Sequence, residues 1–168
     1  QCGGDAAEVR VPEEFGDLRS GGATIELLLQ LTDDAPGEIL FSTLHEAGAG
    51  VQIKTATLDG HLTLAITLTD GIETCRWHTD PGAVVVGRKC HVVIICDVAA
   101  TVLAIIANGE FLDGGTHRPY EWGRIPAALG TLQGARSIRL GAEATMVRVY
   151  GRALRTGEAI GNFRATML

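Results

Sequence analysis

Residues 61–70 read His-Leu-Thr-Leu-Ala-Ile-Thr-Leu-Thr-Asp, so a large hydrophobic residue occupies every second position. The same period of two recurs in residues 24–32, where Leu28 is an exception, and in residues 146–150. Successive side chains of a β-strand point to opposite faces of the sheet, so this period predicts strands with one buried and one exposed face. That pattern is typical of antiparallel sheets.

Tight-turn dipeptides separate these runs. Asp59-Gly60, Asp70-Gly71 and Asn108-Gly109 tolerate the positive φ angles that two-residue hairpins need. The chain from Val51 to Asp80 is therefore predicted to form a three-stranded meander. Further strands are predicted at Cys90–Asp97, Thr101–Ala107, Glu110–Leu112, Ser137–Leu140 and Thr145–Tyr150. Ten to twelve short strands in 168 residues indicate one all-β domain, either a sandwich or a barrel.

Two segments depart from the strand pattern. Residues 114–134 contain five glycines and two prolines, which predicts a long ordered surface loop. Near the end of the chain, Thr156 is a candidate helix N-cap and Glu158 suits the first helical turn. Ala159, Ile160 and Phe163 would give this short closing helix its hydrophobic stripe.

Composition excludes several classes of function. The net charge is −6 and the 14 basic residues are dispersed, which disfavours nucleic-acid binding. No hydrophobic run approaches the roughly 20 residues that a transmembrane helix needs. The chain begins at Gln1 instead of Met, so we expect any targeting signal to lie upstream and the protein to be secreted or part of the cell envelope.

Four cysteines are present: Cys2, Cys75, Cys90 and Cys96. None forms a C-x-x-C pair, which disfavours a zinc site. Four cysteines allow three complete disulfide pairings, and the sequence does not choose among them. In one regular strand, Cys90 and Cys96 would lie about 20 Å apart, too far for a disulfide. Buried free thiols are the alternative.

Two stretches carry a resemblance to a known family. Residues 87–97, Gly-Arg-Lys-Cys-His-Val-Val-Ile-Ile-Cys-Asp, together with Asn108–Leu112, resemble the central strands of laminin-G-like domains. Residues 137–141 and 147–160, which include Val-Arg-Val-Tyr-Gly-Arg-Ala-Leu, resemble the end of the same domains, with Val147 and Val149 in the core and Arg148 in solvent. Cys90 stands where that family usually has tryptophan.

The resemblance places the chain in the concanavalin A-like lectin and glucanase superfamily. It implies a two-sheet antiparallel jelly-roll sandwich with one short C-terminal helix, formed by residues 1–168 as a single domain. Because this fold hosts many unrelated functions, the function has to be argued from particular residues.

Catalysis lacks a recognisable pattern. Retaining glucanases of this fold need two carboxylates about 5–5.5 Å apart, which on one strand means acidic residues at i and i+4. No predicted strand offers such a pair, although two carboxylates could still converge from separate strands. His91 and Arg76 could be imagined in a site that cleaves acidic polysaccharides, but no motif supports one.

Sugar binding has better candidates, because exposed aromatic rings stack on the hydrophobic faces of pyranoses. Only 5% of the residues are aromatic, so Trp77 and Trp122 stand out. The densest group of candidate ligand-binding residues lies in the Gly/Pro-rich segment and consists of His117, Arg118, Tyr120, Trp122 and Arg124. The alternative is that Tyr120 and Trp122 pin the loop to the sandwich, and that Trp77, which shares a strand face with Cys75, belongs to the core.

A cation would find its best oxygen donors at Asp33, Asp34, Asp113 and Glu143. Calcium, which takes 6–8 oxygen ligands, often from loops, is the candidate cofactor. The alternative for Asp33 and Asp34 is a simple turn-forming role.

The sequence therefore favours a non-catalytic, carbohydrate- or glycoprotein-binding accessory module of a larger secreted or envelope protein. A purely structural or protein-interaction module, packed against other domains of its parent chain, is the second hypothesis. A glycan-cleaving enzyme is the third.

Overall fold

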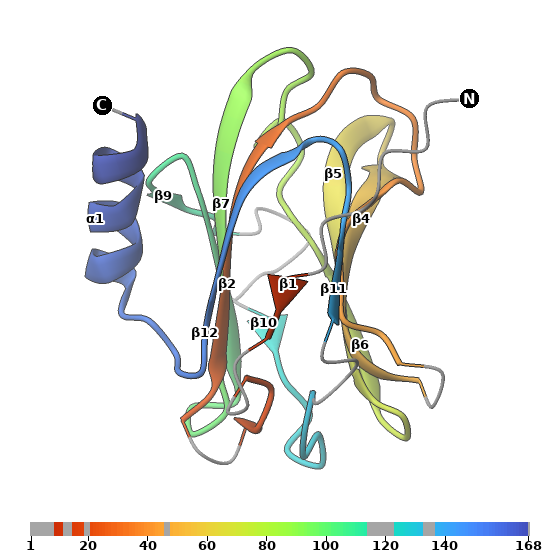
Figure 1. Ribbon diagram of the computed structural model, residues 1–168, viewed down its shortest axis with the longest axis vertical. Coiled ribbons are helices and arrows are strands. Elements are labelled where there is room, and N and C mark those ends of the chain that lie inside the picture. Colours follow the sequence, from red (N-terminus) through yellow and green to blue (C-terminus); the bar gives the residue numbers. More distant parts are fainter. Residues whose placement is uncertain are drawn as a thin grey trace.

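The structure is a computed structural model that describes residues 9–11, 15–18, 21–45, 48–113, 123–132 and 137–167. Within these ranges the chain forms two antiparallel sheets and one helix (Figure 1). The first sheet has the order β1 (Val9–Arg10), β11 (Ser137–Leu140), β3 (Ile39–Ser42), β4 (Ala49–Leu58), β5 (His61–Asp70) and β6 (Thr74–His78). The second has the order β10 (Gly123–Arg124), β8 (Val102–Ala107), β7 (Lys89–Asp97), β2 (Ala23–Gln30) and β12 (Ala144–Tyr150), and β9 (Glu110–Phe111) pairs with β8.

The two sheets stack face to face and enclose the hydrophobic core, while the C-terminal helix α1 (Thr156–Met167) lies outside the second sheet (Figure 1). The predicted alternation of inward hydrophobic residues is confirmed in both layers, but the prediction of an exposed outer face is wrong for β2, in which Thr24 and Glu26 are also fully buried. Leu64, Ile66 and Leu68 of β5 have no exposed surface, and the inward residues of β2 are at most 1% exposed. Burial of these side chains from water is the main force that holds the sheets together.

The meander predicted for residues 51–80 is formed by β4, β5 and β6. Asp59 and Gly60 have φ angles of 50° and 78°, so they make the expected two-residue hairpin, in which Leu58 pairs with His61. The turn from β5 to β6 is longer than predicted. The Asp70 carboxylate accepts hydrogen bonds from the backbone N–H groups of Ile72 and Glu73 at 2.9 and 2.8 Å, which stabilises a four-residue turn instead.

Strand β7 is buried on both faces, which explains why residues 90–97 are almost continuously hydrophobic. Its inward residues join the main core. Val93 and Ile95, which point outward, pack with Ile106, Leu154 and Ala159 in a second hydrophobic cluster. This cluster joins the second sheet to α1 and to the segment that precedes it.

The helix begins at Thr156, and the cap is made by another residue. The Glu158 carboxylate accepts a hydrogen bond from the backbone N–H of Arg155 at 2.8 Å and also pairs with the Arg152 guanidinium. Glu158 thus satisfies a backbone donor at the start of the helix, the role that the sequence assigned to Thr156. No helix in the described ranges is long and hydrophobic enough to cross a membrane.

A buried carboxylate links α1 to the second sheet. Glu26 of β2 has no exposed surface, and its Oε1 accepts hydrogen bonds from His91 Nε2 and Arg148 Nη1, both at 2.9 Å. Its Oε2 accepts from the Tyr150 hydroxyl at 2.7 Å and from Asn162 Nδ2 of α1 at 2.9 Å. Arg148 is therefore half-exposed but paired, rather than simply solvated as predicted.

Three of the four cysteines lie in the described ranges, and all three are free thiols. Cys90 and Cys96 are buried in β7, and Cys75 of β6 is partly buried against the same core. The alternative of buried free thiols is therefore confirmed for these residues, while Cys2 lies outside the described ranges.

Candidate functional site

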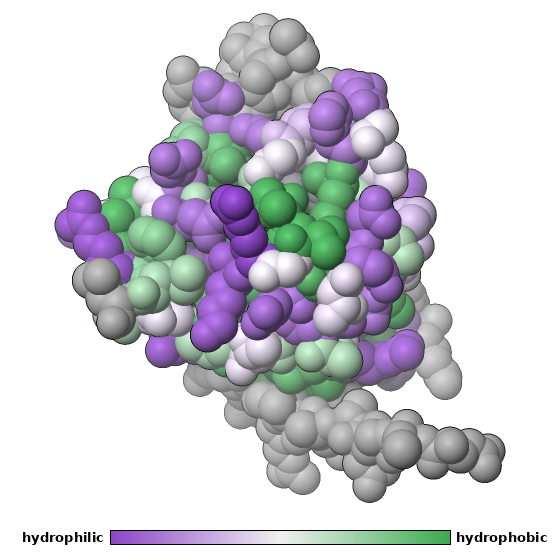
Figure 2. All heavy atoms as spheres, turned by 90° about the horizontal axis from the view of Figure 1, so that it is seen from above, coloured by the Kyte–Doolittle hydropathy of each residue, from purple (hydrophilic) through white to green (hydrophobic). Residues whose placement is uncertain are grey.

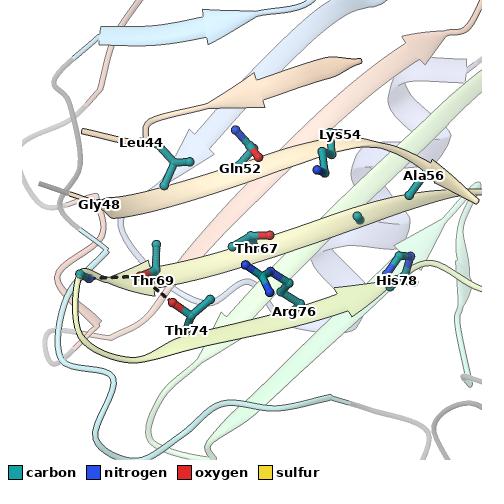
Figure 3. A pocket seen from close by; sticks show the side chains of 12 residues that line it. Leu44, Gly48, Gln52, Lys54, Ala56, Thr67, Thr69, Thr74, Arg76 and His78 are labelled. Carbon is teal, nitrogen blue, oxygen red and sulfur yellow. Dashed lines mark hydrogen bonds between the residues drawn. The ribbon is translucent and has the colours of Figure 1, made fainter. Parts of the chain in front are cut away.

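A pocket of about 670 Å³ lies on the face of β4, β5 and β6 that points away from the core (Figure 3). The face is polar because the same alternation that sends Val51, Ile53 and Ile66 inward sends Gln52, Lys54 and Thr67 outward. The pocket extends to the residues that flank the turn between β5 and β6.

The antiparallel register arranges the outward side chains in rows that cross the three strands. One row consists of Gln52, Thr67 and Arg76, and the next consists of Lys54, Ala65 and His78. Adjacent strands lie about 4.8 Å apart, so residues of one row are close neighbours. In Figure 3 the Arg76 side chain extends from β6 toward Thr67 of β5. Amide, hydroxyl, ammonium, guanidinium and imidazole groups therefore lie within one small area.

The hydroxyl groups at the edges of the pocket are already hydrogen-bonded. Thr74 donates to Thr69 Oγ1 at 3.0 Å, and Thr69 also accepts a bond from the backbone N–H of Gly71. His78 Nδ1 lies 3.2 Å from Thr63 Oγ1, and burial lowers the pKa of His78 below its usual value of 6.5. His78 is therefore neutral at pH 7, which leaves Lys54 and Arg76 as the charged groups that line the pocket.

Of the residues that the sequence had proposed for ligand binding, only Trp77 and Arg124 lie in the described ranges. Trp77 is half-buried and packs against the core, and a Cβ atom added to Gly123 would lie 2.7 Å from its ring. Its placement fits the alternative interpretation, a core residue. Arg124 is exposed in β10 and does not line the pocket. His117, Arg118, Tyr120 and Trp122 lie outside the described residues.

Of the four residues proposed for a cation, Asp33 and Glu143 both lie near Glu38. Asp33 accepts a hydrogen bond from the backbone N–H of Ala35 at 2.9 Å, as expected of a turn-forming residue, and Asp34 is exposed beside it. Asp113 follows β9, next to the second sheet. Glu143 lies between β11 and β12. Among the residues that the structure describes, no three His, Cys, Asp or Glu side chains form a group that could hold a metal ion.

Glu143 nevertheless has a carboxylate neighbour that the sequence did not indicate. Burial and the closeness of Glu143 and Asp33 raise the pKa of Glu38 above its usual value of 4.5. The Oε2 atom of Glu143 is buried and has no hydrogen-bond partner among the described residues. Two carboxylates in contact repel each other when both are ionised.

We expect Glu38→Gln to stabilise the protein slightly at pH 7, by about 0.5 kcal/mol, or about 1–2 °C in the melting temperature. Because the pKa of Glu38 is higher in the folded state than the usual 4.5, its protonated carboxyl group stabilises the folded state below pH 4.5. This stabilisation is lost as the pH rises through the pKa of the folded state. The gain should therefore disappear near pH 4. Thermal melts of wild type and Glu38→Gln at both pH values test this, with Glu73→Gln in the β5–β6 turn as the control. A lower melting temperature for Glu38→Gln at pH 7 would contradict it.

The same melts test the calcium prediction. A cation held by Glu38 and Glu143 would raise the melting temperature of wild type on addition of CaCl₂ and leave that of Glu38→Gln unchanged. Equal responses of both variants would contradict a calcium site at this pair.

Two other surfaces have hydrophobic side chains at their centres. A pocket of about 500 Å³ beside the start of α1 is lined mainly by hydrophobic side chains such as Ile95, Phe111 and Leu154. At the upper end of the sandwich, hydrophobic side chains gather near the centre and hydrophilic ones surround them (Figure 2). More than half of the residues that line the pocket on β4, β5 and β6 are polar or charged, so that face is the better candidate for a polar ligand.

No protein-family model matches the chain, and no curated protein matches it significantly. Several solved structures are similar to it. The SAP-like pentraxin from Limulus polyphemus has a TM-score of 0.59 at 12% identity, over 83% of this chain and 68% of that chain. The Ruminococcus gnavus IT-sialidase CBM40 bound to α2,3-sialyllactose also has a TM-score of 0.59, at 15% identity, over 93% of this chain and 96% of that chain.

The binding domain of botulinum neurotoxin serotype D has a TM-score of 0.67 at 12% identity, over 96% of this chain and 40% of that chain. At such low identity these likenesses establish the fold alone. The chain has the concanavalin A-like jelly-roll fold, as the sequence predicted. The narrower resemblance to laminin-G-like domains stays a prediction.

Apart from Arg76, the polar residues of the pocket were not among the residues singled out from the sequence. A signal for them was present. A two-residue hairpin at Asp59-Gly60 pairs Leu58 with His61. Six residues further from the turn on each strand, the same register pairs Gln52 with Thr67. This face has no Trp, Tyr or Phe among the residues that line its pocket, so the preference of sugars for aromatic rings did not point to it.

Proposed function

We propose that the chain is a non-catalytic carbohydrate-binding module whose ligand lies in the pocket on β4, β5 and β6. The observation that carries this proposal is the row Gln52–Thr67–Arg76 on the outward face of the meander. Amide, hydroxyl and guanidinium groups are suited to the hydroxyl and ring oxygens of a sugar, which need donors and acceptors together. A pocket of about 670 Å³ also lies within the usual range of small-molecule sites.

The lining of the pocket supports binding without catalysis. Hydrolysis of a glycosidic bond normally needs two carboxyl groups on either side of it. No Asp or Glu is among the residues that line this pocket. A sugar bound there would meet hydrogen-bonding and cationic groups but no acid–base pair.

The likenesses in fold support the proposal by analogy only. The sialidase module is a carbohydrate-binding module by its name, and its structure contains sialyllactose. The neurotoxin chain is more than twice as long as the part that this fold covers, so the fold also occurs within larger proteins. We accordingly propose an accessory module of a larger secreted or envelope protein, which binds a free glycan or the glycan of a glycoprotein.

A glycan array tests the proposal. We expect wild type to bind at least one class of glycan, and Thr67→Val to weaken that binding about three- to tenfold, since it removes one hydroxyl hydrogen bond worth about 1 kcal/mol while it keeps the shape of the side chain. Thr57→Val, on an exposed residue of β4 outside the pocket, is the matched control. Trp122→Ala tests the competing prediction that the aromatic segment binds the sugar.

Each outcome of the array is informative. Loss of binding in Thr67→Val but not in Thr57→Val supports the pocket. Loss in Trp122→Ala alone transfers the site to the segment that contains it and overturns the assignment of the pocket. Absence of binding to every glycan contradicts the function and favours the structural module.

A further inference from the structure

We propose that the pocket on β4, β5 and β6 selects an anionic glycan, one whose carboxylate or sulfate group binds between Lys54 and Arg76. This inference rests on the proposed function and names the chemical class of its ligand.

The outward face of the first sheet is basic although the protein is acidic. The whole chain has 20 acidic and 14 basic residues. The strand register nevertheless forms one row of paired residues across five strands. In order from β11 to β6, this row consists of Arg139, Ser42, Gln52, Thr67 and Arg76. This row across five strands carries an arginine at each end, and Lys54 stands in the neighbouring row. No carboxylate lines the pocket between them, so an incoming anion meets a local positive field.

Within the part of the chain that the structure describes, Lys54 and Arg76 have no carboxylate as a partner. Neither side chain forms an ion pair with a described carboxylate, although surface lysines and arginines of an acidic protein have many carboxylates available. Lys54 is only partly exposed, since it lies in the middle of β4. A cation that is partly removed from water and unpaired gains more from an arriving anion than a fully solvated one does.

The spacing of the two cations suits one anionic group. They come from β4 and β6, with β5 between them, so their Cα atoms are two strand spacings, or about 10 Å, apart in the direction across the sheet. Both side chains are long enough to approach a group that sits above β5, and Ala65 contributes only a methyl group to the floor of the pocket beside Lys54. Figure 3 shows Lys54 and Arg76 on opposite sides of β5, with Thr67 between their strands.

The missing side chains argue against a neutral sugar held by stacking. No Trp, Tyr or Phe is among the residues that line the pocket. Without an aromatic platform, most of the affinity must come from hydrogen bonds, and those between a charged donor and a charged acceptor are about twice as strong as neutral ones. An acidic sugar makes use of Lys54 and Arg76, whereas a neutral sugar leaves both charges without a counterpart.

The test is an array that carries each oligosaccharide in three forms: neutral, carboxylated and O-sulfated. We expect one anionic form to bind at least about tenfold more tightly than its neutral counterpart. Arg76→Gln and Lys54→Gln should each weaken that binding about tenfold. Raising NaCl from about 0.1 M to about 1 M should weaken it as well, because the Debye length falls from about 10 Å to about 3 Å. The two anionic forms distinguish a carboxylate from a sulfate ligand.

Arg88→Gln and Lys89→Gln are the matched controls, since both side chains are exposed near the start of β7, in the other sheet, and both variants change the net charge equally. If the control variants weaken binding as much as the pocket variants, only the overall charge matters and the inference is wrong. Equal binding of neutral and anionic forms, insensitive to Arg76→Gln, also overturns the inference but leaves the proposed function intact. Absence of binding to all three forms overturns both.

Discussion

Glu26→Gln should lower the free energy of unfolding by about 3 kcal/mol or more, and the melting temperature by roughly 10 °C. The carboxylate has no exposed surface and accepts four hydrogen bonds, two on each oxygen. Glutamine keeps the size of the side chain but replaces one oxygen by an NH₂ group. An NH₂ group in the place of Oε1 faces the Arg148 guanidinium, which can only donate, and one in the place of Oε2 faces the Asn162 amide and the Tyr150 hydroxyl, which must reorient to accept from it.

The pH dependence of this effect has a definite sign. Burial would raise the pKa of Glu26, but hydrogen bonds from His91 and Tyr150 and the charge of Arg148 outweigh it, so the pKa lies below the usual 4.5. Because the pKa of Glu26 is lower in the folded state than in the unfolded state, the ionised carboxylate stabilises the folded state at pH values above the unfolded-state pKa. This stabilisation is lost as the pH falls through the folded-state pKa. The difference between wild type and Glu26→Gln should therefore shrink as the pH falls below about 4.5.

Urea denaturation at several pH values measures both predictions. Glu110→Gln, an exposed residue of β9, is the control and should change the free energy of unfolding by no more than about 0.5 kcal/mol. Asn162→Ala removes one of the four donors, from the helix side, and should cost about 1 kcal/mol. A cost for Glu26→Gln no greater than that of Glu110→Gln would show that the carboxylate does not hold α1 to the sheet.

Gly22→Ala is expected to be similarly damaging, at about 3 kcal/mol, for a reason that lies in the backbone. Gly22 directly precedes β2 and has a φ angle of 85°, in the region that L-residues other than glycine occupy at a cost of about 1–2 kcal/mol. A Cβ atom at this position would also overlap the backbone carbonyl oxygen of Cys96 and approach the Ala153 side chain. Because Cys96 lies in a central strand, its carbonyl cannot easily move away.

Gly60→Ala separates the two causes. Gly60 has a nearly equal φ angle of 78°, but a Cβ atom there would meet nothing within 4 Å. Its replacement should therefore cost only the conformational part, about 1–2 kcal/mol. Urea denaturation of both variants gives the difference, which measures the close approach of Gly22 to β7. Equal costs for the two variants would show that this approach contributes nothing.

The architecture could be predicted from the sequence because most of its elements follow from local patterns. The alternation in residues 61–70 assigned each side chain to a face, and Asp59-Gly60 set the register of its hairpin. Elements without such a pattern were not found. Strand β10 has two residues, too few for any period. Its Gly123 pairs with Leu103 and lies close to the Trp77 ring, a contact between residues far apart in the sequence.

The contacts around Glu26 could not be predicted, because its partners are far away in the chain. His91, Arg148 and Asn162 are 65, 122 and 136 residues from it, and each looks like a solvated polar residue when taken alone. In the sequence, Glu26 is one of several polar residues that alternate with hydrophobic ones in residues 24–32. That pattern gives no indication of what surrounds its carboxylate.

The candidate site was predicted less well than the fold. Residues were chosen by type, as rings for sugars and carboxylates for a cation, and the structure places Trp77 against the core and Asp33 in a turn. The row Gln52–Thr67–Arg76 becomes visible only when three strands are aligned. Single side chains of common types are uninformative until the register brings them together.

The free thiols in the core have a practical consequence for chemical labelling. Burial raises the pKa of Cys75 and of Cys90 to about 11, and that of Cys96 to about 12. Alkylating reagents attack the thiolate, so at pH 8 these three side chains should remain unmodified for as long as the sandwich stays closed. The rate at which these cysteines react with a maleimide therefore reports how often the two sheets separate. It measures the opening of the domain without the introduction of a new cysteine.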